Sequence, residues 1–337
     1  MRVDAERVLI VLLGAIGDVA RALPLLARVR AGYPRARIVW ALEPAAAPLL
    51  EHHPALDARV VFARAGGARA FGRFLRAVRA VQADLVLDLQ RHAKSGVVSF
   101  ASRAPVRIGF HRRNAKELNW LWNTHTIDPV DPRGWKVEQY LRFADLLELP
   151  PAPAVGVALT PDEEARVDAL LGARARPFAA CFLASTWESR LWFAAGYARL
   201  AEELARRGLD TVLVGAADAS AIAAEIRGLT TAPVLDLTAR TTLRETYGVL
   251  ARARVAVGPD CGPMHLAAVA DTRVVSLWGA TTPARSAPRG SEDLVLVGRV
   301  ACAPCYRRTC PIGRRCMQTI TPERVTAVVD RVLAERR

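Results

Sequence analysis

Aromatic residues are scarce in this chain of 337 residues and make up 6% of it. Proteins that bind unpaired bases usually stack them on aromatic side chains, and so few aromatics leave no obvious platform for that. The sequence also lacks a helix-turn-helix pattern, a zinc-finger spacing of Cys and His, and an aromatic-basic RNA-binding strand. We therefore expect no nucleic-acid partner, although the net charge is +14.

Long apolar runs are missing as well. No stretch of about 18 apolar residues occurs, so we expect no segment to span a membrane. The run Val8–Ile16 has acidic residues on both sides and no small-residue cleavage site, which indicates a buried strand and not a signal peptide. We expect a cytoplasmic protein, in which the six cysteines stay mostly reduced.

Lysine is nearly absent, and almost all positive charge comes from arginine. Of 47 basic residues only Lys94, Lys116 and Lys136 are lysines, against 33 acidic residues. The planar guanidinium suits phosphates and carboxylates, so anionic partners are expected. An anionic membrane surface or an acidic lipid-linked substrate fits this charge. The alternative is an arginine-rich codon bias spread over solvated faces.

The chain length favours two domains, since one hydrophobic core rarely serves more than about 250 residues. Apolar β-rich runs alternate with helical patterns in both halves, which predicts an α/β fold with parallel sheets covered on both faces. We place the boundary in the proline-rich segment Leu149–Ala154, giving domains 1–153 and 154–337. A ligand cleft is expected between the carboxyl ends of the two sets of strands.

Individual elements follow from the same patterns. The predicted strands are Val8–Leu13, Arg37–Leu42, Val60–Phe62, Asp84–Leu89, Phe178–Leu183, Thr211–Gly215, Val255–Gly258 and Arg273–Leu277. The predicted helices are one that begins near Asp18, then Ala68–Val81, Ala194–Arg207, Asp218–Gly228, Leu243–Ala251 and Pro263–Val269. A last helix opens after Thr321, an N-cap followed by proline, and is a candidate to pack back on the first domain.

The segment Gly258–Leu266 joins an apolar strand to a helix through a glycine-containing turn. Glycines let a phosphate approach the backbone, and a helix that starts at about Pro263 offers free N–H groups at its N-terminus. His265 can donate to a phosphate oxygen, and Asp260 can orient backbone amides or bind a sugar hydroxyl. The alternative is an ordinary strand-turn-helix junction in which Asp260 caps the helix.

Four segments resemble glycosyltransferase family 9, the ADP-heptose:lipopolysaccharide heptosyltransferases. Gly258–Leu266 is similar to the family's Asp-Thr-Gly-x-x-His donor motif, and Val274–Pro283 to its strand followed by Gly-x-Thr-x-Pro. Gly14–Pro24 resembles the Gly-Asp-x5-Pro opening, and Asp84–Ser95 the Asp-x-Gln-x-x-x-Lys-Ser stretch. The similarity spans almost the whole chain, in matching order.

The resemblance implies a GT-B architecture, with the acceptor on the first Rossmann-like domain and the nucleotide-sugar on the second. It implies that heptose passes from ADP-heptose to the lipopolysaccharide inner core, with inversion and without a metal or another cofactor. The sequence agrees, because it contains no Asp-x-Asp pair to hold a cation against a diphosphate. Peripheral contact with the inner membrane is expected.

Site residues follow from the same resemblance. Asp18 matches the carboxylate that removes the acceptor's proton; its alternative is a helix N-cap. Arg190 matches a basic residue at the donor diphosphate, where its fork keeps the charge. The remaining matches are Ser185 and Thr186 as phosphate-loop hydroxyls, Asp218 near the nucleoside, and Lys94 and Arg113 toward the acceptor's acidic groups.

Departures from the family leave the substrates open. Cys261 replaces a threonine of the donor motif, so that only its backbone N–H remains, and Arg21 stands where histidine is common. Another nucleotide-sugar or another surface glycan is therefore an alternative, and a non-catalytic glycan-binding protein on the same scaffold is a second. A dinucleotide oxidoreductase fits less well, because no Gly-x-Gly-x-x-Gly follows the first strand.

Four of the cysteines gather near the end of the chain, at Cys302, Cys305, Cys310 and Cys316. This spacing is compatible with a four-thiolate metal site, since zinc favours clustered thiolates. Reduced cysteines or a local disulfide are the alternatives. Cys181 lies inside an apolar strand and is expected in the core.

Overall fold

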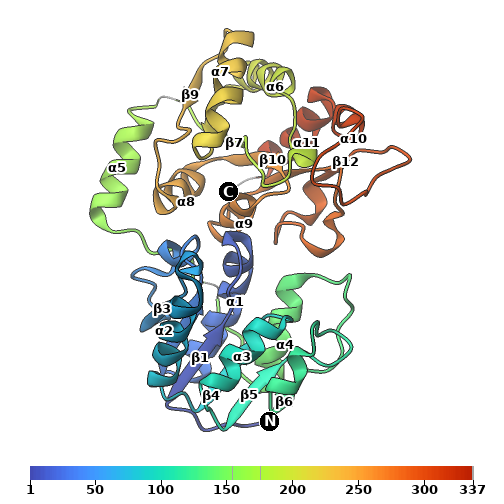
Figure 1. The fold of residues 1–337 in the computed structure, drawn as a ribbon. Helices are drawn as coiled ribbons and strands as arrows, with labels where there is room; N and C mark the ends of the chain where they lie inside the picture. The colour runs from blue at the N-terminus through green and yellow to red at the C-terminus, as the bar shows by residue number, and fades with distance from the viewer. Residues whose placement is uncertain (154, 175, 336–337) are drawn as a thin grey trace. The chain divides into compact units, whose positions relative to one another are not determined.

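The structure, a computed structural model, describes residues 1–153, 155–174 and 176–335. The chain forms two compact units, Met1–Ala158 and Leu159–Arg337, and each contains a parallel sheet flanked by helices (Figure 1). The predicted α/β class with two doubly wound domains is confirmed. The boundary expected between residues 153 and 154 adjoins residue 154, which lies outside the described residues, and its exact place stays a prediction.

The first unit holds a sheet of strand order β3-β2-β1-β4-β5-β6, with all neighbours parallel. Its strands are β1 Arg7–Val11, β2 Arg37–Leu42, β3 Ala58–Val61, β4 Leu85–Asp88, β5 Val106–Gly109 and β6 His125–Thr126. Its helices are α1 Ile16–Gly32, α2 Gly67–Ala80, α3 Ala93–Ala101 and α4 Lys136–Leu146, with the 3-10 turns η1 Ala47–Leu50, η2 Arg64–Gly66 and η3 Asn119–Trp122.

The second unit repeats this plan with strand order β12-β11-β10-β7-β8-β9. Its strands are β7 Phe178–Phe182, β8 Asp210–Val214, β9 Val234–Asp236, β10 Val255–Pro259, β11 Val274–Trp278 and β12 Val295–Val297. Its helices are α5 Pro161–Leu171, α6 Ala194–Arg206, α7 Ser220–Leu229, α8 Leu243–Arg252, α9 Gly262–Val269, α10 Arg315–Gln318 and α11 Pro322–Ala334. Four 3-10 turns complete it: η4 Glu188–Arg190, η5 Ala217–Ala219, η6 Pro283–Arg285 and η7 Glu292–Leu294.

The buried strands explain why the sequence folds this way. The central strands of both sheets are apolar and buried along their length, as a sheet with helices on both faces requires. Thr321 caps α11 as predicted, and α11 packs on α6 and β11. Within the described part of the chain, no helix is both long and apolar enough to cross a bilayer.

Strand order fixes where ligands bind in such sheets. The order reverses between β1 and β4 in the first unit and between β7 and β10 in the second. A crevice opens at the carboxyl ends of strands at such a switch point, and ligands of open α/β sheets bind there. The segments that follow β1, β4, β7 and β10 carry most of the candidate site residues, while Arg113 follows β5 and Asp218 follows β8.

Candidate functional site

Asp18 lies in the first turn of α1, directly after β1. The N-cap of α1 is Ala15, so the alternative interpretation of Asp18 as the capping residue is wrong. Arg21 donates to Oδ1 of Asp18 at 2.7 Å, and Lys136, the first residue of α4, donates to the same oxygen. Burial raises the pKa of Asp18, but the charges of Lys136 and Arg21 outweigh it and hold that pKa well below its ordinary value. The carboxylate is therefore ionised.

Sequence reasoning missed Lys136. It lies 118 positions from Asp18, and no local pattern links the two. One signal was available, since a cation at the first position of a helix opposes the helix dipole and has no stabilising role within that helix. Arg21 was noted only as a departure from the family.

Lys94 and Arg113 follow the carboxyl ends of β4 and β5, as acceptor-side residues should. The Lys94 ammonium pairs with Glu43 at 2.8 Å and lies 4.5 Å from the centre of the Phe62 ring. Arg113 is exposed to solvent. No interaction described in the structure joins either residue to Asp18, so the three share one sheet edge without direct contact.

Asp88, at the end of β4, is a buried carboxylate that the sequence motif contained but assigned no role. Asn119 donates to Oδ2 at 2.7 Å and Ser95 at 3.2 Å. Burial raises the pKa of Asp88 to about 6, although these hydrogen bonds act in the opposite direction. Asp88 thus ties the start of α3, which carries Lys94, to the end of its strand.

The donor-side residues form a cluster around Asp260. Arg190 pairs with Asp260 Oδ2 at 3.2 Å, and the Thr281 hydroxyl donates to the same oxygen at 2.8 Å. The Ser185 hydroxyl donates to the Asp260 carbonyl at 2.9 Å. The Arg190 guanidinium also lies 4.0 Å from the centre of the Trp187 ring. Three predicted residues are brought together, while sequence reasoning assigned no role to Thr281 or Trp187.

The start of α9 differs from the alternative interpretation in which Asp260 caps the helix. Its N-cap is Cys261 and not Asp260, and the Cys261 side chain makes no capping hydrogen bond. Burial raises the pKa of the Cys261 thiol to about 12, so the thiol is neutral. The Gly262 N–H has no partner within the helix and remains available to an anion, whereas Pro263 has no N–H to offer. His265 is buried, with 4% of its surface exposed.

Gly258 serves strand packing more directly than phosphate approach. A Cβ atom at this position would lie 2.7 Å from the Phe182 Cβ and 3.0 Å from the Phe182 carbonyl oxygen. Any side chain would therefore push β10 away from β7. The glycine keeps the two central strands together, and the segments that follow them carry Ser185 and Asp260.

A cavity of about 490 Å³ lies beside this cluster within the second unit. Ser185 and Asp218 both line it, together with Trp192, Phe193 and Arg314. Ser185 therefore belongs to the cavity and to the Asp260 cluster at once. Thr186 is exposed and makes no side-chain contact that places it in either.

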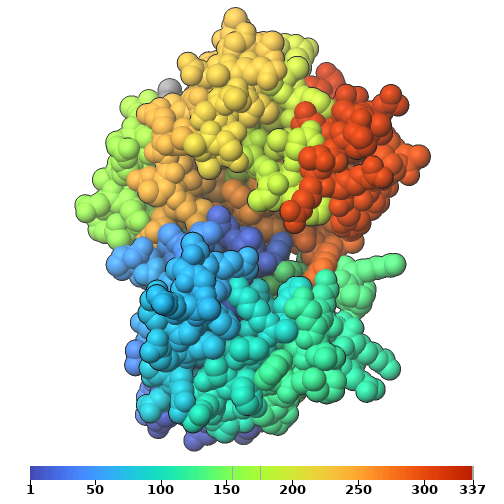
Figure 2. Space-filling view, viewed as in Figure 1, coloured from blue at the N-terminus to red at the C-terminus, as the bar shows by residue number. Residues whose placement is uncertain are grey.

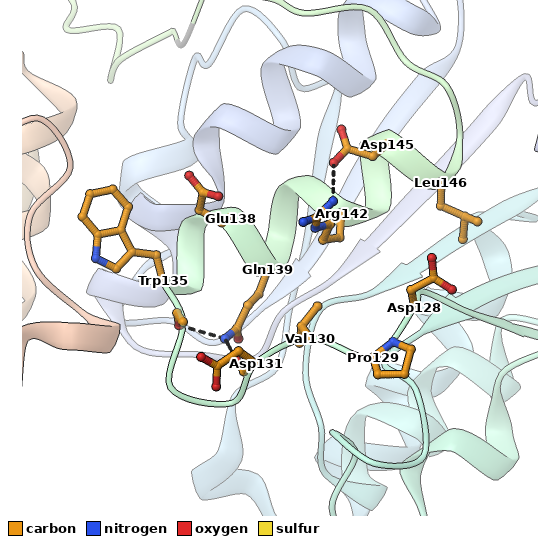
Figure 3. Close-up of a pocket in the computed structure, with 11 residues that line it drawn as sticks. Asp128, Pro129, Val130, Asp131, Trp135, Glu138, Gln139, Arg142, Asp145 and Leu146 are labelled. Carbon is orange, nitrogen blue, oxygen red and sulfur yellow. Dashed lines mark hydrogen bonds and ion pairs between the residues drawn. The ribbon is translucent and has the colours of Figure 1, made fainter.

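A second cavity, of about 760 Å³, belongs to the first unit and runs between the loop 128–135 and α4 (Figure 3). Its charged lining residues are Asp128, Asp131, Glu138, Arg142 and Asp145. Neither of the two basic residues predicted for the acceptor lines it. Because carboxylates dominate the lining, this cavity does not suit an anionic ligand.

The segment Cys302–Cys316, called the cysteine segment below, contacts the turn η4, which carries Arg190. Ser189 in η4 donates through its hydroxyl to the Arg307 carbonyl at 2.5 Å, and Arg314 pairs with Glu188 at 2.9 Å. All six cysteines are free thiols, and Cys181 is buried in β7 as predicted. Among the described residues, no group of three or more His, Cys, Asp or Glu side chains is arranged to hold a metal ion.

Comparisons with known proteins bear on the family and the fold of this chain. Lipopolysaccharide heptosyltransferase 1 of Pseudomonas aeruginosa is 30% identical over 330 residues, covering 90% of this chain and 87% of that protein. A glycosyl transferase family 9 protein from Veillonella parvula superposes with a TM-score of 0.87 at 18% identity, covering 100% and 99% of the two chains.

The E. coli heptosyltransferase WaaC, solved with ADP-2-deoxy-2-fluoro heptose, superposes with a TM-score of 0.73 at 23% identity, covering 96% of this chain and 99% of WaaC. These structural likenesses confirm the predicted GT-B fold of two Rossmann-like domains. Residues 71–315 match the family model described as glycosyltransferase family 9 (heptosyltransferase). The chain therefore belongs to glycosyltransferase family 9.

Proposed function

We propose that this enzyme transfers heptose from ADP-heptose to the inner core of lipopolysaccharide, with inversion and without a metal ion. The main support for this is that one chain contains both a candidate base and a candidate diphosphate site. An ionised carboxylate, Asp18, follows the central strand of the first sheet, and the Arg190–Asp260–Thr281 cluster follows the central strands of the second. The P. aeruginosa relative, a lipopolysaccharide heptosyltransferase, supports the choice of substrates.

In the proposed reaction Asp18 accepts the proton of the acceptor hydroxyl while that oxygen attacks the anomeric carbon of the heptose. The bond from this carbon to the diphosphate breaks, and ADP leaves with the electron pair. Arg190 and the Gly262 N–H at the start of α9 balance the charge that develops on the diphosphate. These groups take the part that a divalent cation plays in other transferases, so the proposal needs no metal.

The cavity beside Ser185 is the proposed place of the nucleoside. Asp218 in its wall offers a carboxylate to the ribose hydroxyls. Ser185 and Thr186 supply hydroxyls toward the phosphates, while Cys261 contributes only its backbone N–H. His265 is the other side chain proposed to approach the phosphates, from the first turn of α9.

On the first unit, Lys94 and Arg113 are the proposed contacts for the acidic groups of the acceptor. Arg113 is exposed and needs no rearrangement. Lys94 is paired with Glu43, which also pairs with Arg64 at 2.8 Å. Since Arg64 remains with Glu43, Lys94 can turn to an acceptor anion without leaving that carboxylate unpaired.

We also propose that the enzyme works at the cytoplasmic face of the inner membrane through an apolar patch on the first unit. Phe100, Leu118 and Leu121 are 55%, 63% and 57% exposed, on α3 and beside η3, which pack together. Figure 2 shows the stretch around residues 93–122, cyan to green, at the surface of this unit. Between residues 91 and 127, Glu117 is the only carboxylate against seven Lys and Arg. Apolar side chains amid cations suit an anionic lipid surface.

Vesicle binding tests the patch. The triple variant Phe100→Ser, Leu118→Ser, Leu121→Ser should lose sedimentation with anionic phospholipid vesicles, and wild-type binding should weaken as salt is raised. Leu229→Ser is the matched control, because Leu229 is 52% exposed on the second unit. Undiminished binding by the triple variant would remove the patch from the proposal.

The transfer itself is tested by ADP release from ADP-heptose in the presence of an inner-core acceptor. Asp18→Ala should abolish release, while Arg142→Ala, a change on the exposed face of α4, should not. Thermal stabilisation by ADP-heptose, UDP-sugars and GDP-sugars separates this donor from the alternatives. Stabilisation without any turnover would support a glycan-binding protein that has kept the scaffold.

A further inference from the structure

We propose that Lys136 is a positioning residue which, with Arg21, occupies one oxygen of the Asp18 carboxylate and leaves the other, Oδ2, to take the acceptor's proton. The proposal rests on the proposed function of Asp18 as the base. It adds which atom acts and which residues orient it.

The contacts of the two carboxylate oxygens differ. Arg21 and Lys136 both donate to Oδ1. Oδ2 lies on the side of Gly14, where a Cβ atom would stand 2.9 Å from it and 2.8 Å from the Cβ of Asp18. Because Gly14 has no side chain, its backbone approaches Oδ2 closely, and a side chain at this position would clash with the Asp18 carboxylate.

Lys136 is held in place by its surroundings. Gln139, one turn further along α4, donates to the carbonyls of Asp131 and Gly134 at 2.8 Å each and thereby fixes the loop that leads into Lys136 (Figure 3). At the other end of α4, Asp145 pairs with Arg28 of α1 at 2.7 Å. The two helices are therefore joined at both ends, and the Lys136 ammonium meets Asp18 with little freedom to move away.

The position of Lys136 is otherwise unfavourable. It is the first residue of α4, where the helix dipole repels a cation, and the helix has no side-chain cap to offset this. The Lys136 ammonium contacts the Asp18 carboxylate and lies 5.7 Å from the centre of the Tyr140 ring on its own helix, and these contacts oppose the repulsion by the dipole. No other charged side chain is described facing the Asp18 carboxylate, besides Arg21 on its own helix.

This arrangement sets the timing of proton transfer. Two cations make Asp18 a weak base, so it takes the proton only when the acceptor oxygen is already bonding to the anomeric carbon and its proton has become acidic. The O–H bond then breaks, the proton moves to Oδ2, and the diphosphate departs with the electrons of the glycosidic bond. The resulting acid, beside two cations, loses its proton readily for the next turnover.

The pH profile of kcat separates this role from a structural one. In the wild type the pKa of Asp18 is held well below its ordinary value, so we expect no loss of activity from this group between pH 8 and about 5. In the double variant Arg21→Met, Lys136→Met the effect of burial is no longer offset, and the pKa of Asp18 rises above its ordinary value. Activity should then fall as pH is lowered from 8 to 5 and return when pH is raised again.

Three controls keep the outcomes distinct. Arg142→Met removes a cation from the exposed side of the same helix and should leave the profile unchanged. Lys136→Arg should keep the pH profile of the wild type, because arginine keeps the positive charge beside Asp18. Gly14→Ala places a methyl group beside Oδ2 and should lower kcat at least about tenfold at every pH.

Failure of the inference and failure of the proposed function give different results. If Asp18→Ala abolishes transfer but the double variant keeps the wild-type profile, Lys136 and Arg21 do not orient the base. If Asp18→Ala remains active, the base itself is misassigned and the inference falls with it. Circular dichroism at each pH shows whether a loss of rate is a loss of fold.

Discussion

At the scale of single residues, Asp260 is the residue around which the donor-side side chains gather. It accepts from Arg190 and Thr281 through one oxygen while its carbonyl accepts from Ser185. Sequence reasoning identified Asp260 and Arg190 separately, since each belongs to a local pattern. It gave no hint that they touch, because nothing in either pattern encodes a contact between the loops after β7 and β10.

Arg190 provides the sharpest test of the donor side. Arg190→Ala should lower kcat by about 10²–10³-fold, because the charge developing on the diphosphate loses its balancing cation. Arg190→Lys should lower kcat by a smaller factor, since lysine keeps the charge but not the bidentate fork. Steady-state ADP release measures both, with the exposed Arg227→Ala as control. A wild-type kcat in Arg190→Ala would exclude Arg190 from the reaction.

Asp88 predicts a pH dependence of stability. Its pKa is raised in the folded protein to about 6, so the folded state holds this proton more tightly than the unfolded chain does. Stability from this group is therefore fully present below about pH 4 and is lost as pH rises to about 6, by roughly 2–3 kcal/mol. Asp88→Asn has no such loss and should gain stability relative to the wild type between pH 4 and 7. Urea unfolding at several pH values measures the difference, and parallel curves for the two proteins would contradict it.

At the scale of elements, the strongly apolar strands were predicted correctly and the short ones were missed. β1, β2, β4, β7, β8, β10 and β11 fall where the apolar runs stand. The strands missed are β5, with four residues, β6, with two, and β9 and β12, with three each, all too short for a recognisable period. The helices α3, α4 and α5 were not among the predicted helices, and the hydrogen bond between Ser95 of α3 and Asp88 was missed with them.

The cysteine segment matters at this scale because it supports η4. Ser189→Ala removes the bond to the Arg307 carbonyl from a residue that is 1% exposed. We expect a loss of about 1–2 kcal/mol in stability and a higher KM for the donor, since Arg190 lies on the same turn. Thermal unfolding measures the loss of stability, and steady-state ADP release measures the KM for the donor. Ser220→Ala, at the exposed start of α7, is the control, and equal behaviour of the two variants would show that the segment does not support the donor site.

At the scale of the whole molecule, the repeated strand order explains how one chain provides two chemistries. Each sheet reverses its order at its centre, and each reversal presents charged residues at the carboxyl ends of its strands. The alternation of apolar strands and amphipathic helices predicted this plan from the sequence. It did not predict Lys136, because the partner of Asp18 comes from a helix that the pattern gave no reason to single out.

The whole proposed reaction depends on removal of the acceptor's proton by Asp18 during transfer from ADP-heptose. The most direct measurement compares ADP release by the wild type and by Asp18→Asn, with ADP-heptose and an inner-core acceptor at pH 8. Asn keeps the shape of the side chain but accepts no proton. We therefore expect Asp18→Asn to bind ADP-heptose as the wild type does, which a thermal shift measures. Its kcat should be reduced by at least about 10²-fold. A kcat for Asp18→Asn near that of the wild type would contradict it.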